Sequence, residues 1–450
     1  MITIKKRAAC ARSTWAIALF LSQNAWAGIP IQHWVQPSGA KVFLVESTVI
    51  PMVDVQMDFD AGSRRDPLGQ SGLASAMAAM SDKGVLAQGD SAALDENALS
   101  EAWADLGAGF GASATQDRLS FSLRSLTYPD LLPKAVQLAA RQLSAPAFPD
   151  PIWQRERERW GAAIRQANTR PATLAQQAFS AAVYGTHPYG AETTEATLAS
   201  INTPDLRQRY AQMVLSCRAQ VTVVGSLNRM QADTLVTALL ARLPNSDCPV
   251  LPEVAEVAPL AKAVEQRIAF DSAQAHVLIG QPGVRRDDPD YFALTVGNYI
   301  LGGGGFVSRL THEVREKRGL TYSVYSYFSP ALHAGAFTVG LQTRPDQAAQ
   351  AVQVAKEVVS QFVADGPTEA ELQAAKDNLM GGFALRIDSN RKLLDNVANI
   401  AWNHLPLDYL DTWTQAVAQV SVADIRAAFA RHLQPDRMVT VVLGATEVAR

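Results

Sequence analysis

An arginine and a tyrosine seven positions apart, Arg315 and Tyr322, carry side chains that can stabilise a negative charge developing during a reaction. A guanidinium group is a fixed, planar cation that can hold a carbonyl or a carboxylate. A phenolic hydroxyl can donate a hydrogen bond to an oxyanion. Composition alone favours a plainer interpretation, in which Arg315 is ion-paired within the charged run 313–317 and Tyr322 is a core aromatic. Whether Arg315 and Tyr322 have a functional role therefore depends on the elements that position them.

Residues that could bind a metal ion are scattered along the sequence. Its seven histidines include no two at a spacing that brings both to one metal from a single helix. His312 and Glu313 begin like a zinc-binding helix, but Glu316 occupies the position of the second histidine. The sequence also shows no nucleophile–base set, cofactor fingerprint or carboxylate pair. We therefore expect no metal, no cofactor and no complete catalytic site in this chain.

Three short patterns recur in the same order about 220 positions further along the sequence. Gly-Ser-Arg-Arg-Asp at 62–66 recurs as Gly-Val-Arg-Arg-Asp at 283–287. Patterns that begin at Thr127 and Asp205 recur from Thr343 and Asp424. Matches at nearly one offset predict two related halves of about 210 residues each. We place the halves at 28–245 and 266–450, joined by a proline-rich, extended linker at 246–265.

Strands and runs of several helices follow one another in each half, a pattern typical of an α+β fold. In the first half, β-branched and aromatic runs predict strands, and apolar spacing with caps predicts helices. The strands are expected at 41–45, 53–59, 120–125 and 221–224, and the helices at 69–82, 90–106, 129–143, 152–168, 171–183 and 203–214. We expect each half to be a mainly antiparallel sheet with helices packed on one face.

The first 27 residues have the three parts of a secretory signal peptide. A basic segment precedes an apolar run at 15–21, and Ala25-Trp26-Ala27 supplies the small-residue cleavage pattern. The apolar run is much shorter than the roughly 20 residues of a membrane-spanning helix. We expect a periplasmic or secreted bacterial protein that is not attached to the membrane after cleavage. A net charge of −3 without a basic stripe gives no reason to expect a nucleic-acid partner.

Two cysteines, Cys217 and Cys248, follow the predicted cleavage site, and an oxidising compartment would allow them to pair. Cys217 precedes the strand expected at 221–224, and Cys248 follows a helical stretch at 230–243. If the chain runs away along the strand and returns along the helix, both cysteines lie at the same end of this strand–helix unit. We predict a Cys217–Cys248 disulfide, with two unpaired thiols as the alternative.

Several motifs together resemble the pitrilysin/insulinase-type zinc peptidases, the family that includes the mitochondrial processing peptidase. The Gly-Ser-Arg at 62–64, the Gly-Leu-Ala at 72–74 and the stretch 80–84 resemble the family's N-terminal signature. His-Pro-Tyr-Gly at 187–190 matches another landmark, and residues 301–326 resemble the C-terminal domain motif. The resemblance covers essentially the whole chain after residue 27. It implies two halves that face each other as a clam shell.

The zinc motif of this family is missing. Active members carry His-x-x-Glu-His on one helix, where the histidines bind zinc and the glutamate acts as general base. Here Ser75 and Ala79 replace the histidines, and Ala78 replaces the glutamate. The position of the third, carboxylate ligand falls on Ala163, with Glu156 and Glu158 nearby. The resemblance therefore implies a chain that binds no zinc and is inactive alone.

The same resemblance gives Arg315 and Tyr322 a role. In active relatives, such a pair comes from the second domain and faces the zinc across a cavity. Some bacterial members are short chains that pair, one with the zinc ligands and the other with the Arg/Tyr pair. We predict a noncatalytic subunit of a heterodimeric, secreted zinc metallopeptidase, whose zinc-bearing homologous partner cleaves peptides. The alternative is a non-enzymatic peptide-binding or scaffold protein of the same fold, including a homodimer.

Two glycine-rich stretches each allow two interpretations. Gly303, Gly304 and Gly305 contact substrate, as a glycine-rich loop does in the noncatalytic subunit of the processing peptidase, or they form a plain turn. Residues 107–115 lead into the strand at 120–125, which pairs with the substrate backbone in active relatives. This second stretch has either a binding role at the sheet edge or the role of a glycine-rich hairpin.

Overall fold

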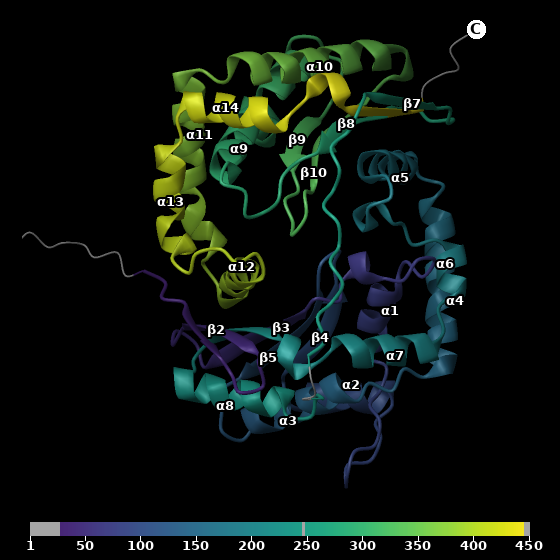
Figure 1. The fold of residues 1–450 in the computed structure, drawn as a ribbon, viewed down its shortest axis with the longest axis vertical. Helices are drawn as coiled ribbons and strands as arrows, with labels where there is room; N and C mark the ends of the chain where they lie inside the picture. The colour runs from purple at the N-terminus through teal and green to yellow at the C-terminus, as the bar shows by residue number, and fades with distance from the viewer. Residues whose placement is uncertain (1–27, 245–247, 445–450) are drawn as a thin grey trace, which may run out of the picture.

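The computed structural model describes residues 28–244 and 248–444, which form two halves, one above the other in Figure 1. The N-terminal sheet lies at the bottom of that view and the C-terminal sheet at the top. The predicted signal peptide, residues 1–27, lies outside the described residues. The structure confirms the α+β class and the organisation in two halves. Within the described residues, no helix has the length and apolar composition needed to cross a membrane.

The N-terminal half contains a six-stranded sheet with the order β1-β2-β6-β3-β5-β4. Its strands are β1 (Gln32–Val35), β2 (Lys41–Glu46), β3 (Met52–Phe59), β4 (Gly109–Ala114), β5 (Leu119–Leu126) and β6 (Gln220–Gly225). Its helices are α1 (Leu73–Met80), α2 (Glu96–Asp105), α3 (Leu132–Ser144), α4 (Asp150–Ala167), α5 (Pro171–Tyr184), α6 (Glu195–Ala199), α7 (Thr203–Met213) and α8 (Arg229–Leu240). The predicted strands correspond to β2, β3, β5 and β6. The prediction missed β1 and β4, and the glycine and alanine content of β4 gives it little strand propensity.

The C-terminal half contains a five-stranded sheet with the order β7-β11-β8-β10-β9. Its strands are β7 (Val264–Ile268), β8 (Ala275–Pro282), β9 (Val324–Phe328), β10 (Ala336–Thr343) and β11 (Val439–Leu443). Its α-helices are α9 (Tyr291–Asn298), α10 (Ala348–Asp365), α11 (Glu369–Gly381), α12 (Asn390–Trp402), α13 (Tyr409–Gln419) and α14 (Val422–His432).

The two sheets share one topology. In spatial order, β2, β6, β3, β5 and β4 of the first sheet correspond to β7, β11, β8, β10 and β9 of the second. In each sheet one pair, β2 with β6 or β7 with β11, is parallel, whereas the other neighbouring strands are antiparallel. The internal repeat of the sequence is therefore a repeat of structure.

The alternation of side chains along β3 builds the layers of the N-terminal half. Val55, Met57 and Phe59 are fully buried in the core that the helices of this half cover. Because successive side chains of a strand point to opposite faces, Asp54 and Asp58 lie on the other face of the sheet. This inner face, turned toward the C-terminal half, is polar along β3.

Each sheet also receives a helix from the other half. Helix α5 packs on β8 and β11, and α12 packs on β6 and β3. Phe179 of α5 lies in an apolar cluster with strands of the C-terminal sheet, and Val397 of α12 lies in one with Phe43 of β2. The two helices begin at Pro171 and Asn390, 219 positions apart, so they are equivalent elements of the repeat. Helices therefore lie on both faces of each sheet, in contrast to the single covered face that was expected.

The linker ends two residues earlier than predicted, because β7 already begins at Val264. Residues 248–263 contain no helix or strand and run between the two halves (Figure 1). The carbonyl oxygen of Ala255 lies 2.9 Å from Nε2 of His187. A carboxylate oxygen of Glu256 accepts a hydrogen bond of 2.8 Å from the backbone N–H of Ala334. The linker is thus bonded to both halves.

Candidate functional site

Helix α1 is the helix that carries the zinc motif in active relatives, and here it has no metal-binding side chain. Its start is well formed, since Asp66 accepts hydrogen bonds of 2.9 Å from the backbone N–H groups of Gly72 and Ala74. Position 78, which would hold the general base, carries a methyl group that is 6% exposed. Ser75 and Ala79, at the histidine positions, are partly exposed on the same helix.

The neighbouring helix α4 does not supply the missing metal ligands. Ala163, at the position expected for the third ligand, is exposed and has no donor atom. Glu156 is buried, and it forms ion pairs with Arg155 and Arg159. Zinc needs three protein ligands beside its reactive water. The side chains on α1 and α4 do not supply such a set, so these residues do not fit zinc.

One cluster that the sequence did not reveal brings three potential metal ligands together. Donor atoms of Asp288, Asp290 and His432 lie within 4.8 Å of one another, the one such group found in the part of the chain that the structure describes. Arg431 forms an ion pair with Asp290, and Nε2 of His432 lies 2.9 Å from the same carboxylate. These contacts form a self-contained ion-pair network. It was missed because 142 residues separate His432 from Asp290 in sequence.

Arg315 and Tyr322 lie side by side. Arg315 is on the π-helical turn η6 (Thr311–Glu316), and its guanidinium carbon lies 5.0 Å from the ring centroid of Tyr322. The Tyr322 side chain is 82% exposed. Tyr322 is therefore not a core aromatic, and its hydroxyl is available to a molecule that binds at this surface.

The ion pairs of the surrounding charged run do not include Arg315. Lys317 and Arg318 both pair with Glu313, and Nδ1 of His312 lies 3.0 Å from Glu316. No carboxylate of residues 28–244 or 248–444 lies within ion-pair distance of Arg315. The interpretation of Arg315 as an ion-paired surface residue is therefore wrong. An arginine without a counter-charge, beside an exposed tyrosine, can accept an anionic or carbonyl group from another molecule.

The glycine run ahead of this pair has structural causes. A Cβ atom at Gly302 would lie 2.5 Å from the backbone nitrogen of Ser326 on β9, and one at Gly304 would lie 2.7 Å from the carbonyl oxygen of Tyr299. A Cβ atom at Gly303 would lie 2.8 Å from the amide nitrogen of Asn298. Gly305 has a φ of +62° with open space around it. Packing thus explains three of the four glycines, while substrate contact at Gly303, Gly304 and Gly305 stays a prediction.

Strand β4 lies at the edge of the N-terminal sheet and pairs only with β5. The two strands form a hairpin, as one of the two interpretations holds, and the hairpin also creates a free edge. Its side chains are small, apart from Phe110, whose ring stacks on Trp103 at 5.7 Å. A free edge strand offers unpaired backbone groups that an extended peptide can use.

The polar inner face of the N-terminal sheet carries two buried aspartates, each paired with a partly exposed arginine. Asp54 accepts a hydrogen bond of 2.6 Å from Arg124, and Arg118 lies 3.3 Å from Asp58. Burial raises the pKa of Asp58, while the Arg118 guanidinium acts in the opposite direction. The alternation of polar residues along β3 could have indicated this face from sequence.

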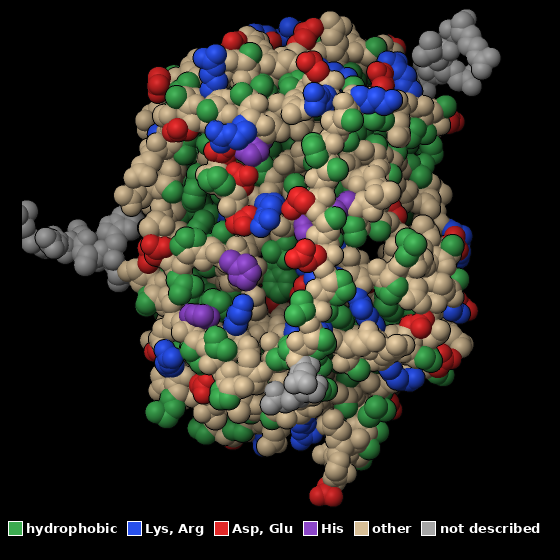
Figure 2. Space-filling view, viewed as in Figure 1, with side chains coloured by type: hydrophobic (Ala, Val, Ile, Leu, Met, Phe, Trp, Pro, Cys, Tyr) green, Lys and Arg blue, Asp and Glu red, His purple; other side chains and the backbone are tan. Residues whose placement is uncertain are grey.

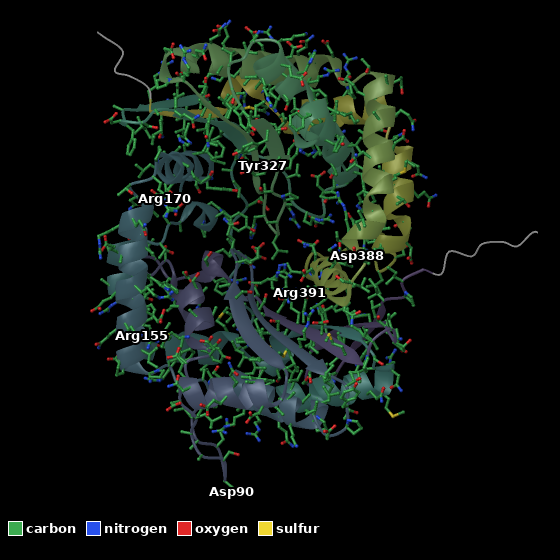
Figure 3. The ribbon with its side chains drawn as sticks, turned by 180° about the vertical axis from the view of Figure 1, so that it is seen from behind. Asp90, Arg155, Arg170, Tyr327, Asp388 and Arg391 are labelled. Carbon is green, nitrogen blue, oxygen red and sulfur yellow. A yellow bond between two sulfur atoms is a disulfide. The ribbon has the colours of Figure 1, made fainter. Side chains whose placement is uncertain are left out.

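Aromatic side chains mark the opposing C-terminal sheet. On β9, Tyr325 and Tyr327 stack with centroids 5.9 Å apart and are 43% and 38% exposed. Figure 3 shows Tyr327 on this sheet, above the space between the halves, with Arg391 of α12 on the lower side. Figure 2 shows the opposite side of the molecule hollowed between the halves, with acidic, basic and histidine side chains around the hollow. Polar and aromatic side chains thus line part of the space between the halves.

The His-Pro-Tyr-Gly landmark joins the two halves. The hydroxyl of Tyr189 donates a hydrogen bond of 2.6 Å to Asp117 and accepts one of 3.2 Å from the backbone N–H of His333. Burial, followed by the Asp117 carboxylate, raises the pKa of Tyr189, so the hydroxyl keeps its proton. The other oxygen of Asp117 accepts a hydrogen bond from the backbone of Leu332. The loop between β9 and β10 is therefore bound to the N-terminal half.

Cys217 and Cys248 form a disulfide with a Cα–Cα distance of 6.3 Å, the pairing that the spacing predicts. The bond connects the short turn before β6 with the start of the linker. Arg218 adds a hydrogen bond of 2.6 Å to the carbonyl oxygen of Pro249.

Comparison with known proteins places this architecture among peptidases and their inactive relatives. Residues 41–197 match the model of Insulinase (Peptidase family M16), and residues 200–379 match that of the Peptidase M16 inactive domain. The crystal structure of a peptidase M16 inactive domain from Pseudomonas fluorescens matches with a TM-score of 0.86 and 34% sequence identity. That match covers 93% of this chain and 99% of the other.

Two curated relatives differ in what their names state. A Helicobacter pylori protein named a non-peptidase homolog is 26% identical over 404 residues, which cover 87% of this chain and 89% of that protein. An uncharacterized zinc protease of Mycobacterium tuberculosis is 29% identical over 270 residues, or 59% of this chain. The match spans 61% of the length of this mycobacterial relative.

Proposed function

This chain belongs to the insulinase family, peptidase family M16, and we propose that it is a noncatalytic subunit that completes the active site of a zinc-bearing homologous chain. The proposed assembly is a heterodimeric, secreted metallopeptidase that cleaves peptides. The absence of zinc ligands on α1 and the name of the Helicobacter pylori relative support a chain that does not cleave peptides by itself.

One observation carries the proposal: Arg315 has no counter-charge among the described residues, and it lies beside an exposed tyrosine hydroxyl. A cation on a protein surface that other charges do not compensate is available for a partner or a substrate. Its neighbours Lys317 and Arg318 both pair with Glu313, whereas Arg315 has no such partner. This chain lacks the zinc-binding part of the site and keeps the Arg/Tyr part, so a zinc-bearing partner would supply what is missing.

The chemistry assigned to this chain concerns the substrate. Zinc in the partner would supply the activated water and polarise the scissile carbonyl. Arg315 would hold the carbonyl oxygen or a nearby carboxylate, and Tyr322 would donate its hydrogen bond to the oxyanion as it forms. Removing one such donor typically costs about 10²- to 10³-fold in rate.

A second candidate function is peptide binding without turnover, in a scaffold or a homodimer. The free edge of β4 supports it, because an extended peptide can add to this edge without any metal. The two candidates differ in one respect. Only the subunit proposal requires Arg315 and Tyr322 to change the rate of another chain.

We also propose that the protein works in the periplasm or outside the cell. The disulfide supports an oxidising compartment, since such bonds are rare in reducing cytosol. The sequence of residues 1–27 supports export.

The test is a mixing experiment. Residues 28–450 are purified alone and with the His-x-x-Glu-His-bearing relative encoded in the same genome, and cleavage of quenched fluorescent peptides is followed. We expect turnover that depends on this chain, that a chelator abolishes, and that Arg315→Ala and Tyr322→Phe lower about 10²- to 10³-fold.

Two control variants are matched by residue type. Arg318→Ala removes a neighbouring arginine that is ion-paired with Glu313, and Tyr128→Phe alters a tyrosine that is 47% exposed elsewhere. Both should leave the rate unchanged. Turnover that is equal with and without this chain would refute the subunit proposal. Peptide binding by this chain alone, without any effect on a partner, would favour the scaffold.

A further inference from the structure

Phe306 is a large apolar side chain at an unusual place. It is 69% exposed, it follows the glycine run directly, and its ring centroid lies 4.8 Å from the guanidinium carbon of Arg315. The Tyr322 ring contacts the same guanidinium at 5.0 Å. We propose that Phe306 is a positioning residue, which acts through Arg315 by holding the guanidinium in place for the substrate. The inference rests on the proposed function and deepens it.

The loop that carries Phe306 is anchored from beneath. Ser308 is fully buried, and its hydroxyl donates a hydrogen bond of 2.7 Å to the carbonyl oxygen of Gly305 and lies 3.0 Å from the hydroxyl of Thr311. Gly305 adopts a φ of +62°, which a residue with a side chain rarely adopts. The backbone therefore fixes where the residue after Gly305 points. Phe306 is held over Arg315 by this anchored turn.

Burial of the ring does not explain why a phenylalanine stands at position 306. A phenylalanine in a core is usually covered, and an exposed one loses most of the free energy that burial would provide. The contact with Arg315 gives the ring an attractive partner, because the negative face of an arene attracts a cation. The adjacent Val307 is 74% exposed and, because it has no aromatic ring, it cannot make a contact of this kind. Phe306 and Val307 thus share exposure and differ in their relation to Arg315.

Contact with two rings restricts an arginine side chain that would otherwise sample many rotamers. The rings contact the guanidinium group without accepting its N–H hydrogen bonds, which stay available to an oxygen of the substrate. Because Arg315 has no carboxylate partner to orient it, the rings are its orienting contacts on the described surface. Loss of Phe306 should leave the charge present but poorly placed. An effect of this kind appears in kcat more than in KM, since alignment matters most in the transition state.

The test compares three variants of this chain in the mixture with the zinc-bearing relative. The probe is one quenched fluorescent decapeptide, the member of a mixed library that the mixture cleaves fastest. Phe306→Ala should lower kcat about 5- to 30-fold with little change in KM. Phe306→Tyr, which keeps an aromatic ring, should restore kcat to within about twofold. Val307→Ala is the matched control and should leave kcat unchanged.

A double variant separates positioning from a general effect on the loop. In an Arg315→Ala background, adding Phe306→Ala should lower kcat no further, because the residue through which Phe306 acts is gone. An additional loss there would overturn the proposal, as would equal effects of Phe306→Ala and Val307→Ala. If Arg315→Ala itself has no effect on turnover, the proposed function fails, and the two failures are thereby distinguishable.

A readout that needs no partner tests the contact directly. In protein labelled with ¹⁵N-arginine, the Nε–Hε signal of Arg315 is identified by its loss in Arg315→Lys. A ring above the guanidinium shifts this proton upfield, so Phe306→Ala should move it downfield, whereas Val307→Ala should not. An Arg315 signal that is the same in Phe306→Ala and in the unchanged protein would overturn the proposal whether or not a partner is found.

Discussion

The ring of Phe179, on α5 in the N-terminal half, lies against the backbone of Gly280, on β8 in the C-terminal half. A Cβ atom at position 280 would come within 2.9 Å of this ring and 2.0 Å of the carbonyl oxygen of Phe337. Phe179 is 1% exposed. It belongs to the N-terminal half by sequence, but it packs on the sheet of the C-terminal half. The two halves are therefore joined by interlocked elements in addition to the linker.

Phe179→Ala should destabilise the whole chain. Deleting a fully buried phenylalanine typically costs about 3–5 kcal/mol, and this side chain packs a helix of the N-terminal half on the C-terminal sheet. We expect a lower midpoint of urea denaturation, measured by circular dichroism, with a loss of stability in both halves at once. Leu385→Ala, at a site that is 67% exposed, is the control and should change the midpoint little. Selective loosening of the N-terminal half alone would contradict the interlocked arrangement.

Removal of the disulfide should cost stability without unfolding the protein. The bond closes a loop with a sequence separation of 31, for which the chain-entropy model predicts about 3–4 kcal/mol. Cys217→Ser/Cys248→Ser should therefore lower the thermal midpoint measured by calorimetry. Alkylation followed by mass measurement, before and after reduction, reports the bond itself. Two thiols that alkylate without reduction would show that the bond is not formed.

Tyr189→Phe should weaken the junction between the halves. It removes the hydroxyl that donates to Asp117 and accepts from the backbone N–H of His333, so this N–H loses its partner, while Asp117 keeps its ion pair with Arg64. Such a loss costs about 1–3 kcal/mol. The free energy of unfolding in urea measures the cost, and hydrogen exchange at 330–335 should quicken. Tyr325→Phe, a partly exposed tyrosine on β9, should have neither effect.

Stability should depend on Glu371 at low pH. The bidentate hydrogen bonds from Arg309, both 2.7 Å, lower the pKa of Glu371 to about 2, although partial burial alone would raise it. Because the folded-state pKa lies below the unfolded value, the stabilisation is fully present above about pH 4.5 and is lost as the pH falls toward 2.

Comparing Glu371→Gln with the unchanged protein measures how much the ionised Glu371 contributes to the free energy of unfolding. The stability difference between the two should shrink by about 1 kcal/mol between pH 6 and pH 3, a figure reduced for solvent screening at this partly exposed site. Urea denaturation at the two pH values gives the difference. Glu357→Gln, an exposed position on α10, is the control. A difference that is constant with pH would show that Arg309 does not perturb Glu371.

Much of the site could be predicted because its signals are local. The missing zinc motif is visible in five consecutive residues, 75–79, since a helix brings positions i and i+4 to one face whatever surrounds it. The spacing of Arg315 and Tyr322 and the pairing of Cys217 with Cys248 likewise depend on short segments. Strand β4 was missed because small residues carry little strand propensity, and pairing with β5 decides its state.

The sequence by itself determined the α+β halves, their repeat and the loss of the metal ligands, because periodicity and motif spacing are properties of neighbouring residues. Only the tertiary structure decided that α5 and α12 exchange between the sheets, that Tyr189 meets His333, and that Phe306 lies over an Arg315 without a counter-charge. Each of these relationships joins side chains whose meeting depends on packing across the fold or on how a turn is anchored. The free energy that selects such contacts comes from burial and charge in the assembled molecule, which local propensity does not contain.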